Sequence, residues 1–406
     1  MISLKDIRNA FLVALWFMFL TFPLMVIKVN PIERVVTWRW HNMLYVAGGS
    51  FVLFLAGRLF VKQKEARRER IRKRQEREKM EWTQKILNDP KIYRPLLGII
   101  GVFALVFPFI FSTYQTNIMI TALMYVMLGL GLNIVVGVAG LLDLGYVAFY
   151  AVGAYCYSLL HLHFGIGFWT ALPLGALLAA AFGIILGFPV LRLRGDYLAI
   201  VTLGFGEIIR LILENWNAFS KGPSGISNIA RPGLFGIEMS LDFAITYLYF
   251  VMIALVLFTI FVVNRLQNSR IGRAWFALRE DEIACQAMGI DKTRTKLTAF
   301  ALGATWAGMV GVIFAAKTTF VNPASFTFLE SAIILCIVVL GGMGSIIGVI
   351  LGAFVLILLP EYLRAFADYR MLVFGAVLVT MMVFRPQGII SNIRHTYIYS
   401  GKTENS

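Results

Sequence analysis

The stretch Asn264–Ala299 reads NRLQNSRIGRAWFALREDEIACQAMGIDKTRTKLTA and is a long polar interruption between two apolar runs. It carries seven Lys and Arg residues against four acidic residues. Because Lys and Arg accumulate in the cytoplasmic loops of membrane proteins, this stretch is predicted to lie in the cytoplasm, where ATP is available. The rest of the chain is interpreted as the membrane part that holds this loop in place.

The middle of this loop has the pattern of a helix, a glycine turn and a second helix. Residues Arg279 to Met288 include several strong helix formers, and Gly289 follows them as a stop. Asp291 is positioned to cap a second helix that runs into the membrane. Such a helix pair protruding from the cytoplasmic face is a docking surface for a soluble partner, although an ordinary cytoplasmic loop has the same composition.

Composition excludes a soluble globular protein. Of the 406 residues, 59% are hydrophobic and 15% charged, and the mean hydropathy is +0.77. Repeated runs of about 20 apolar residues predict an all-α polytopic membrane protein with about 10–12 transmembrane helices. The net charge of +15 gathers in predicted cytoplasmic loops. The positive-inside rule and the anionic leaflet explain it, so we expect membrane lipids and no nucleic acid as partners.

Four regions follow from the spacing of the apolar runs. They are an N-terminal two-span module (1–61), a basic cytoplasmic linker helix (62–94), a core (95–390) that contains the loop 264–299, and a cytoplasmic tail (391–406). The linker carries thirteen Lys and Arg residues and is either a lipid-surface or partner-docking helix or a solvated tether. Twelve spans with both termini in the cytoplasm satisfy the charge clusters: 9–29, 43–61, 95–113, 117–138, 143–161, 168–190, 197–214, 243–263, 297–319, 329–343, 345–360 and 370–385.

Two glycine-interrupted segments resemble each other. Residues 132–140 (LNIVVGVAG) and 335–344 (LCIVVLGGMG) both run toward the predicted inner face and turn at glycines. Transporters built from repeats use such paired interruptions to position a substrate route near the midplane. Chance similarity between apolar runs is the alternative. The short spans 329–343 and 345–360 could also form a re-entrant pair, which leaves the topology unchanged.

A translocation path is predicted from glycines and polar groups inside the spans. Packing glycines and interhelical hydrogen bonds are the alternative roles for these residues. The candidates are Asn133, Gly140, Thr202, Gly204, Gly206, Glu207, Gly341 and Gly342. Glu207 is the one ionisable group interpreted as lying at membrane depth, and Arg210 is its expected partner. Asp143 and Asp196 are predicted to be N-caps.

The chain shows no signature of an enzyme or of a bound cofactor. It contains no G-x-x-x-x-G-K-[ST] phosphate loop, so we expect that this chain does not hydrolyse ATP itself. Its three cysteines (Cys156, Cys285, Cys336) have neither disulfide nor metal-ligand spacing, and His161 and His163 lack companions for a metal site. An ion-coupled secondary transporter is one class of membrane protein that the sequence leaves open, and its ion coupling would depend on Glu207.

Several motifs in order resemble the LivHM-type permease family of branched-chain amino acid ABC importers over about residues 95–390. The N-terminal two-span extension is similar as well. The motifs are GLLDLGYVAF (140–149), VGAY (152–155), RLRGDYLAIVTLGFGE (192–207), GPSGI (222–226), GGMGS (341–345) and RPQGI (385–389). Urea and short-chain amide permeases share most of them.

The resemblance implies a type II-like ABC importer permease in a bacterial inner membrane, working by alternating access. Its implied partners are a LivH-type second permease subunit, two cytoplasmic ABC ATPase subunits and a periplasmic amino-acid-binding protein. It implies coupling to the ATPases through Glu282, Ala284, Ala287, Gly289 and Ile290. The loop departs from the plain Glu-Ala-Ala pattern, with Glu282-Ile283-Ala284-Cys285 in its place, so the register of these residues is open by about one position.

Overall fold

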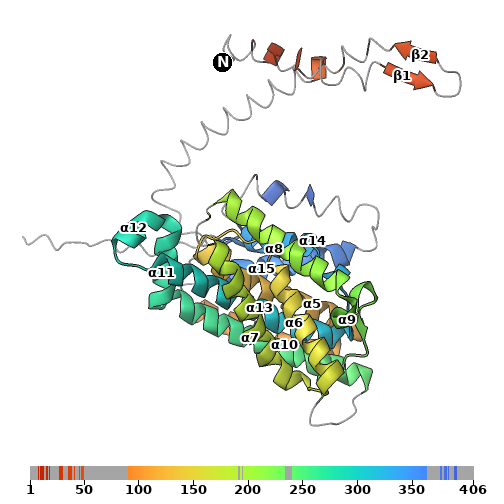
Figure 1. Cartoon of the computed structure of the whole chain (residues 1–406). Coiled ribbons are helices and arrows are strands. Elements are labelled where there is room, and N and C mark those ends of the chain that lie inside the picture. Colours follow the sequence, from red (N-terminus) through yellow and green to blue (C-terminus); the bar gives the residue numbers. More distant parts are fainter. Residues whose placement is uncertain are drawn as a thin grey trace, which may run out of the picture. The chain divides into compact units, whose positions relative to one another are not determined.

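The computed structural model describes residues 90–190, 193, 195–233, 240–363 and 388–390, two short strands near the N-terminus, and single residues between 8 and 49 and between 375 and 383 (Figure 1). The chain divides into two compact units, Met1–Gly101 and Val102–Ser406. The predicted linker up to residue 89 and the tail 391–406 lie outside the described residues, as does most of the spans 9–29, 43–61 and 370–385.

The described part of the first unit corrects the end of the first predicted span. A helix was expected to reach Val29, but β1 (Ile27–Asn30) pairs antiparallel with β2 (Val35–Trp38), with Ile27 opposite Trp38. The β-branched residues in both segments favour strand pairing over helix. A helical first span therefore cannot include residues 27–29.

The described part of the second unit is almost entirely helical. Its two-residue strands β3 (Ile226–Ser227) and β4 (Phe320–Val321) pair antiparallel. A π-helical segment, η1 (Asn133–Val138), extends α5, and η2 (Gly222–Ser224) and η3 (Pro323–Ser325) are 3₁₀ turns. The α-helices are α4 (Pro90–Ile110), which crosses the unit boundary, α5 (Thr113–Leu132), α6 (Val147–Phe164), α7 (Phe168–Val190), α8 (Asp196–Asn215), α9 (Asn217–Ser220), α10 (Leu241–Gln267), α11 (Arg270–Glu280), α12 (Glu282–Ala287), α13 (Lys292–Thr318), α14 (Phe328–Gly341) and α15 (Ile346–Tyr362).

Among the described residues, six helical segments are long and apolar enough to cross a membrane: Thr113–Val138, Val147–Phe164, Phe168–Pro189, Asp242–Gln267, Lys292–Thr318 and Pro323–Gly341. Gly101–Ile110 and Ile346–Tyr362 are shorter apolar helices. The predicted all-α polytopic class is therefore confirmed. The count of 10–12 spans stays a prediction, because several of the expected spans fall largely outside the described residues.

Helix α13 is the element around which the second unit packs. It lies against α7, α6 and α5 (Figure 1). Glycines allow these close crossings: a Cβ added to Gly153 on α6 would lie 2.1 Å from the carbonyl oxygen of Gly308 on α13. One added to Gly183 on α7 would lie 2.8 Å from the Phe300 carbonyl oxygen. Gly153 and Gly183 therefore serve the packing of α6 and α7 against α13.

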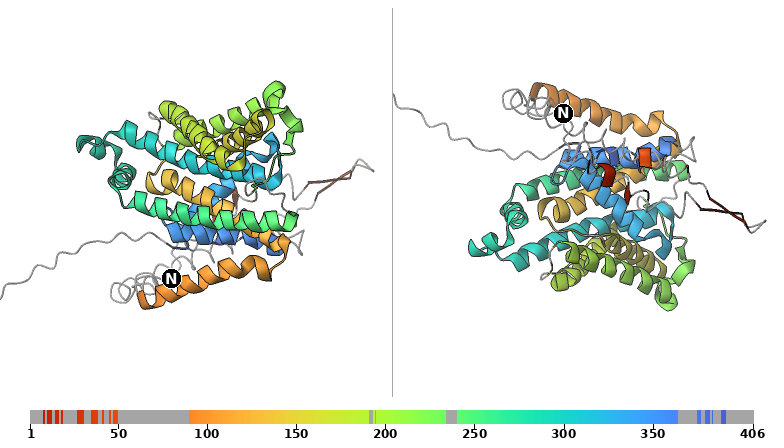
Figure 2. Two further views of the ribbon diagram at one scale, coloured as in Figure 1. Left: turned by 90° about the horizontal axis from the view of Figure 1, so that it is seen from below. Right: turned by 90° about the horizontal axis from the view of Figure 1, so that it is seen from above.

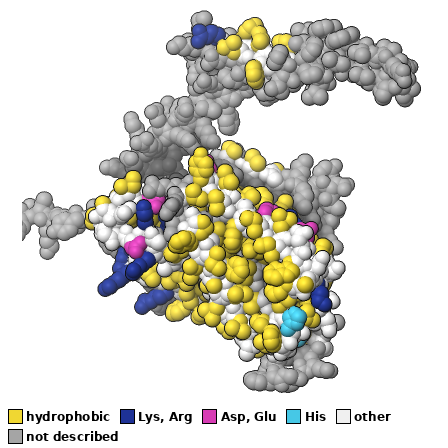
Figure 3. Space-filling view, viewed as in Figure 1, with side chains coloured by type: hydrophobic (Ala, Val, Ile, Leu, Met, Phe, Trp, Pro, Cys, Tyr) yellow, Lys and Arg dark blue, Asp and Glu magenta, His cyan; other side chains and the backbone are white. Residues whose placement is uncertain are grey.

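The two ends of α13 define the two faces of the second unit. α11 and α12 lie at the N-terminal end of α13, as the teal helices of Figure 2 show. At the other end, β4 follows α13 and pairs with β3, which begins at the last residue of the GPSGI motif. Hydrophobic side chains cover much of the flank between the ends, whereas Lys and Arg gather at the α11–α12 end (Figure 3).

Candidate functional site

The predicted coupling loop contains one helix more than expected. A single helix was predicted over residues 279–288, but α11 ends at Glu280 and α12 begins at Glu282. Asp281 separates them because it adopts an extended backbone and its carboxylate accepts hydrogen bonds from the amides of Ile283 (2.8 Å) and Ala284 (2.9 Å). That carboxylate is an N-cap for α12, which breaks the helix-forming run.

The predicted turn and second helix are confirmed. Gly289 has φ +82°, a left-handed conformation typical of a residue that ends a helix. Asp291 caps α13 by accepting from the amides of Thr293 (2.9 Å) and Arg294 (3.2 Å). The α12–Gly289–α13 turn is therefore defined by two caps and one glycine.

Two buried contacts fasten the loop to the end of α13. The Lys296 ammonium lies 2.8 Å from the Glu282 carboxylate, and their side chains are only 3% and 14% exposed. The indole N–H of Trp275, a fully buried residue of α11, donates to the carbonyl of Thr295 at 2.9 Å. Because these contacts join α11 and α12 to α13, a force on the loop reaches a membrane-spanning helix directly.

The opposite side of α12 is open. Ile283 is 68% exposed and Met288 is 83% exposed, and Ala284 and Ala287 are exposed between them. Ile290 is half-buried, and its amide donates to the carbonyl of Cys285 at 3.0 Å. Large apolar side chains at an exposed tip of a charged loop are typical of a protein-binding surface.

The loop also contacts the broken part of α5. The Arg279 guanidinium, in the last turn of α11, donates a hydrogen bond to the carbonyl of Gly137 in η1. Gly140 follows η1 with φ +73°, and a Cβ there would lie 2.7 Å from Cγ of Arg279. Gly140 is thus a turn residue that lets Arg279 approach the backbone, and its role in a translocation path stays a prediction.

Asn133 joins the two glycine-interrupted segments. Its Oδ1 accepts from the amide of Gly344 at 2.8 Å, and the residue is fully buried. A Cβ on Gly137 would lie 1.9 Å from the same oxygen, so the close approach of η1 requires glycine there. The segments 132–140 and 335–344 therefore meet in space, and their common origin as a repeat stays a prediction.

The glycine turn between α14 and α15 is packed on every side. A Cβ on Gly341 would lie 2.4 Å from the carbonyl oxygen of Gly348. Gly342 has φ +114° and lies against Gly388, and the amides of Ile389 and Ile390 donate to the carbonyls of Leu340 and Gly341. Gly341 and Gly342 thus form a buried turn that Gly388, Ile389 and Ile390 contact.

The predicted path residues on α8 divide into two groups. Thr202 is buried, where its hydroxyl accepts from the amide of Leu144 at 3.0 Å, and Gly206 lies against Gly145. Gly204 has open space beside it. Glu207 forms an ion pair with Arg210 at 2.8 Å, as predicted, and Arg210 also binds Glu214 at 2.7 Å.

Neither predicted aspartate N-cap is one. α6 begins at Val147, four residues later than expected, and the fully buried Asp143 lies in the preceding turn, where it accepts from the amide of Gly145 at 2.9 Å. Asp196 occupies the first turn of α8, whose N-cap is Gly195. The Asp143 carboxylate stabilises a turn through its hydrogen bond to Gly145, so α6 begins after that turn. At α8, Gly195 with φ +56° precedes the first helical residue, so Asp196 lies inside the helix.

Glu207 was the one ionisable group predicted to lie within the membrane, but two others lie in candidate membrane-spanning helices. Lys317 on α13 and Glu330 on α14 line one cavity of about 260 Å³ together with Tyr125 and Thr121 of α5. The Tyr125 hydroxyl donates to Glu330, and the Lys317 ammonium donates to the Thr121 hydroxyl. Sequence reasoning missed this pair because each residue lies near the end of a predicted span. The available signal was a charge inside each of the spans 297–319 and 329–343.

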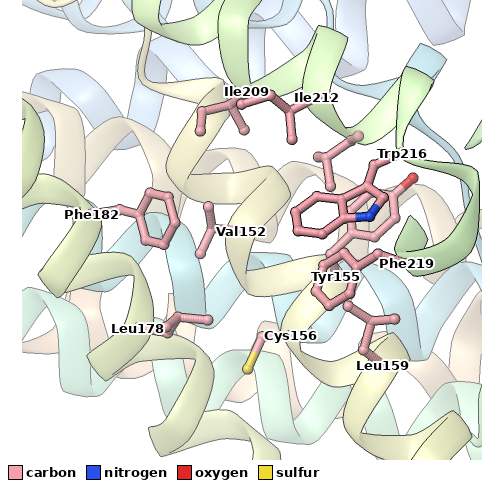
Figure 4. Close-up of a pocket in the computed structure, with 11 residues that line it drawn as sticks. Val152, Tyr155, Cys156, Leu159, Leu178, Phe182, Ile209, Ile212, Trp216 and Phe219 are labelled. Atoms are coloured by element: carbon pink, nitrogen blue, oxygen red, sulfur yellow. The ribbon is translucent and has the colours of Figure 1, made fainter.

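A second cavity of about 430 Å³ lies between α6, α7 and α8 (Figure 4). Phe182 and Leu178 line one side, and Trp216 and Phe219 line the other. With Cys156 as one of its few heteroatoms, the cavity has almost no hydrogen-bonding group for a polar solute. Within the described residues, no three or more His, Cys, Asp or Glu side chains form a group that could hold a metal ion.

Comparison with known proteins agrees with this arrangement. Residues 114–382 match the family described as "Branched-chain amino acid transport system / permease component". The high-affinity branched-chain amino acid transport system permease proteins LivM of Salmonella typhimurium and of Escherichia coli K12 are each 51% identical over 313 residues, which cover 72% of this chain and 74% of theirs. The autoinducer 2 import system permease LsrC of Escherichia coli O9:H4 is 27% identical over 53% of this chain and 61% of its own. No solved structure matches.

Proposed function

The chain belongs to the family of branched-chain amino acid transport system permease components, and on that premise we propose that it is a membrane permease subunit of an ATP-driven importer of leucine, isoleucine and valine. Its place is the bacterial inner membrane, with both termini in the cytoplasm. Its partners are a LivH-type second permease, two ABC ATPase subunits that use ATP and Mg²⁺, and a periplasmic amino-acid-binding protein.

The observation that carries the proposal is the hydrogen bond from Arg279 to the carbonyl of Gly137. It connects the exposed tip of the loop, where ATPases would bind, to the segment at which α5 loses its α-helical pattern. From there Asn133 reaches the Gly341–Gly344 turn through its bond to Gly344. A movement of α11 and α12 therefore acts on both glycine segments, which is the connection that alternating access requires.

Helix α8 supports a second permease subunit. Glu207, Arg210 and Glu214 are partly exposed on a helix that runs between the two faces of the unit. Charged side chains facing lipid are costly, so they face a water-filled route or another protein. Exposed apolar residues on the same helix, such as Ile208 and Leu211, favour a protein neighbour beside that route.

Purification of the chain with its associated proteins in mild detergent tests the proposal. We expect a second permease and ABC ATPase subunits to co-purify, and binding protein loaded with leucine to stimulate ATP hydrolysis. Stimulation by urea or acetamide instead would identify a urea or short-chain amide permease. A chain that purifies alone and moves leucine in liposomes under an ion gradient without ATP would refute the importer.

Gly289 offers a test of coupling. A side chain there meets no atom within 4 Å, so only backbone strain at φ +82° opposes substitution. A β-branched residue should cost roughly 1–2 kcal/mol or more and displace α12, whereas asparagine tolerates this conformation. We expect Gly289→Val to lower leucine uptake per ATP hydrolysed and Gly289→Asn to retain it. Equal ratios in the two variants would contradict the coupling role.

A further inference from the structure

The cavity that contains Lys317 and Glu330 holds opposite charges that do not pair with each other. Each is satisfied by a neutral hydroxyl instead: Lys317 donates to Thr121, and Glu330 accepts from Tyr125. Within the described part of the chain no ion pair joins the two groups, although both line the same 260 Å³ space. Two separated charges within candidate membrane-spanning helices are costly to keep, and they indicate a ligand that uses both.

The remaining bonding capacity of these groups fits a zwitterion. An ammonium has three donors, and Lys317 uses one of them for Thr121, so two remain for a carboxylate. A carboxylate can accept about four hydrogen bonds, so Glu330 can bind an ammonium in addition to the Tyr125 hydroxyl. Phe314 and Tyr150 complete the wall of the cavity with apolar surface. The space is at the small end for ligand sites, which suits a single amino acid.

The cavity lies between the glycine turn and the end of α13 that is remote from the coupling loop. Lys317 is near the end of α13 that is remote from the coupling loop, and Thr121 is eight residues into α5. At 1.5 Å per residue, Thr121 is roughly 12 Å below the outer end of α5 and roughly 18 Å above Asn133. A solute delivered from the outer face would meet this cavity before it reaches Asn133 and the Gly344 amide.

We propose that Lys317 and Glu330 form an outer resting site for the zwitterionic backbone of a small amino acid, with Lys317 binding its carboxylate and Glu330 its ammonium. The site rests on the proposed function for the identity of the solute. A neutral solute such as urea can hydrogen-bond to both groups but forms no ion pair with either, so the site also favours amino acids over amides. No bond is made or broken, and the solute leaves inward when the segments at Asn133 and Gly344 separate.

Uptake by the reconstituted complex with its binding protein tests the site. Lys317→Met and Glu330→Gln should each lower leucine moved per ATP hydrolysed about tenfold or more, the loss expected when a charge-assisted hydrogen bond to the solute is removed. The matched controls are Lys221→Met and Asp242→Asn, which neutralise exposed charges near the same face. Neutral variants that match these controls would overturn the site while leaving the proposed function intact. Absence of leucine uptake by the unaltered complex would overturn both.

Cysteine protection gives an answer even if the neutral variants fail to assemble. Ser325 lines the cavity. The Ser325→Cys change, in a chain whose Cys156, Cys285 and Cys336 are replaced by alanine, would be labelled with a small methanethiosulfonate reagent. We expect leucine to slow labelling severalfold, and leucinamide and 4-methylpentanoate, which each lack one charge, to have little effect. Equal labelling rates with and without leucine would overturn the proposal. Protection by either singly charged analogue that is as strong as protection by leucine would also overturn it.

Discussion

The crossing of α6 and α13 permits a quantitative test of the packing. In the Gly153→Ala variant, the new Cβ would lie 2.1 Å from the Gly308 carbonyl oxygen and 2.6 Å from its Cα, whereas ordinary contact begins near 3.4 Å. Because these are backbone atoms, no side-chain rotation relieves the clash. The two helices must therefore move apart by roughly 1 Å, which forfeits a quarter to a half of the dispersion energy of the contacts around them.

The magnitude follows from two opposing terms. Overpacking of a close crossing costs about 3 kcal/mol, at the upper end of the usual range because backbone atoms are involved. Alanine in place of glycine within a helix stabilises the folded state by about 0.5–1 kcal/mol, because alanine loses less conformational entropy on folding. We therefore expect Gly153→Ala to destabilise the chain by about 2 kcal/mol. The control Gly204→Ala has open space around its Cβ and should stabilise by up to about 1 kcal/mol.

Thermal unfolding of the purified chain in detergent, followed by circular dichroism, measures the difference. The two variants should differ by about 3 kcal/mol, which corresponds to roughly 3–4 °C in Tm for a chain of 406 residues. Both substitutions add the same methyl group to a helical glycine, so the helix-propensity contribution cancels. Tm values that agree within about 1 °C would refute the close crossing of α6 and α13.

Two further predictions concern the polar contacts. Neutralising one partner of the buried pair, in Glu282→Gln or Lys296→Met, should destabilise the loop by about 3 kcal/mol or more, and the double variant should recover part of that loss. Rates of trypsin cleavage in the loop measure the destabilisation. Losses that simply add in the double variant would contradict the pairing. Asn133→Leu removes the acceptor of the Gly344 amide, at a cost of about 1–3 kcal/mol, and should speed hydrogen exchange at that amide. Unchanged exchange at Gly344 would show that Asn133 does not hold the turn.

Local signals in the sequence were sufficient for the class of the protein and for much of its loop. Apolar runs specify membrane helices because the bilayer leaves backbone groups no partner except their own helix. Gly289 and Asp291 marked the turn before α13 correctly, since a left-handed glycine and a capping carboxylate act within a few residues of themselves. The same reasoning misplaced the start of α6, because Asp143 uses its carboxylate for a turn rather than for a cap.

The sequence by itself determined which segments are apolar and where the turn before α13 lies, because those properties depend on neighbours along the chain. Only the tertiary structure decided that Asn133 binds Gly344, 211 residues away, and that Lys317 and Glu330 share a cavity. Each of these side chains has an ordinary local role available, as a helix hydrogen bond or a charge near a span end. Which role each side chain takes depends on how α5, α13 and α14 cross. The crossing brings the partners within a few ångströms of each other, and a hydrogen bond or a strong charge interaction needs that short distance.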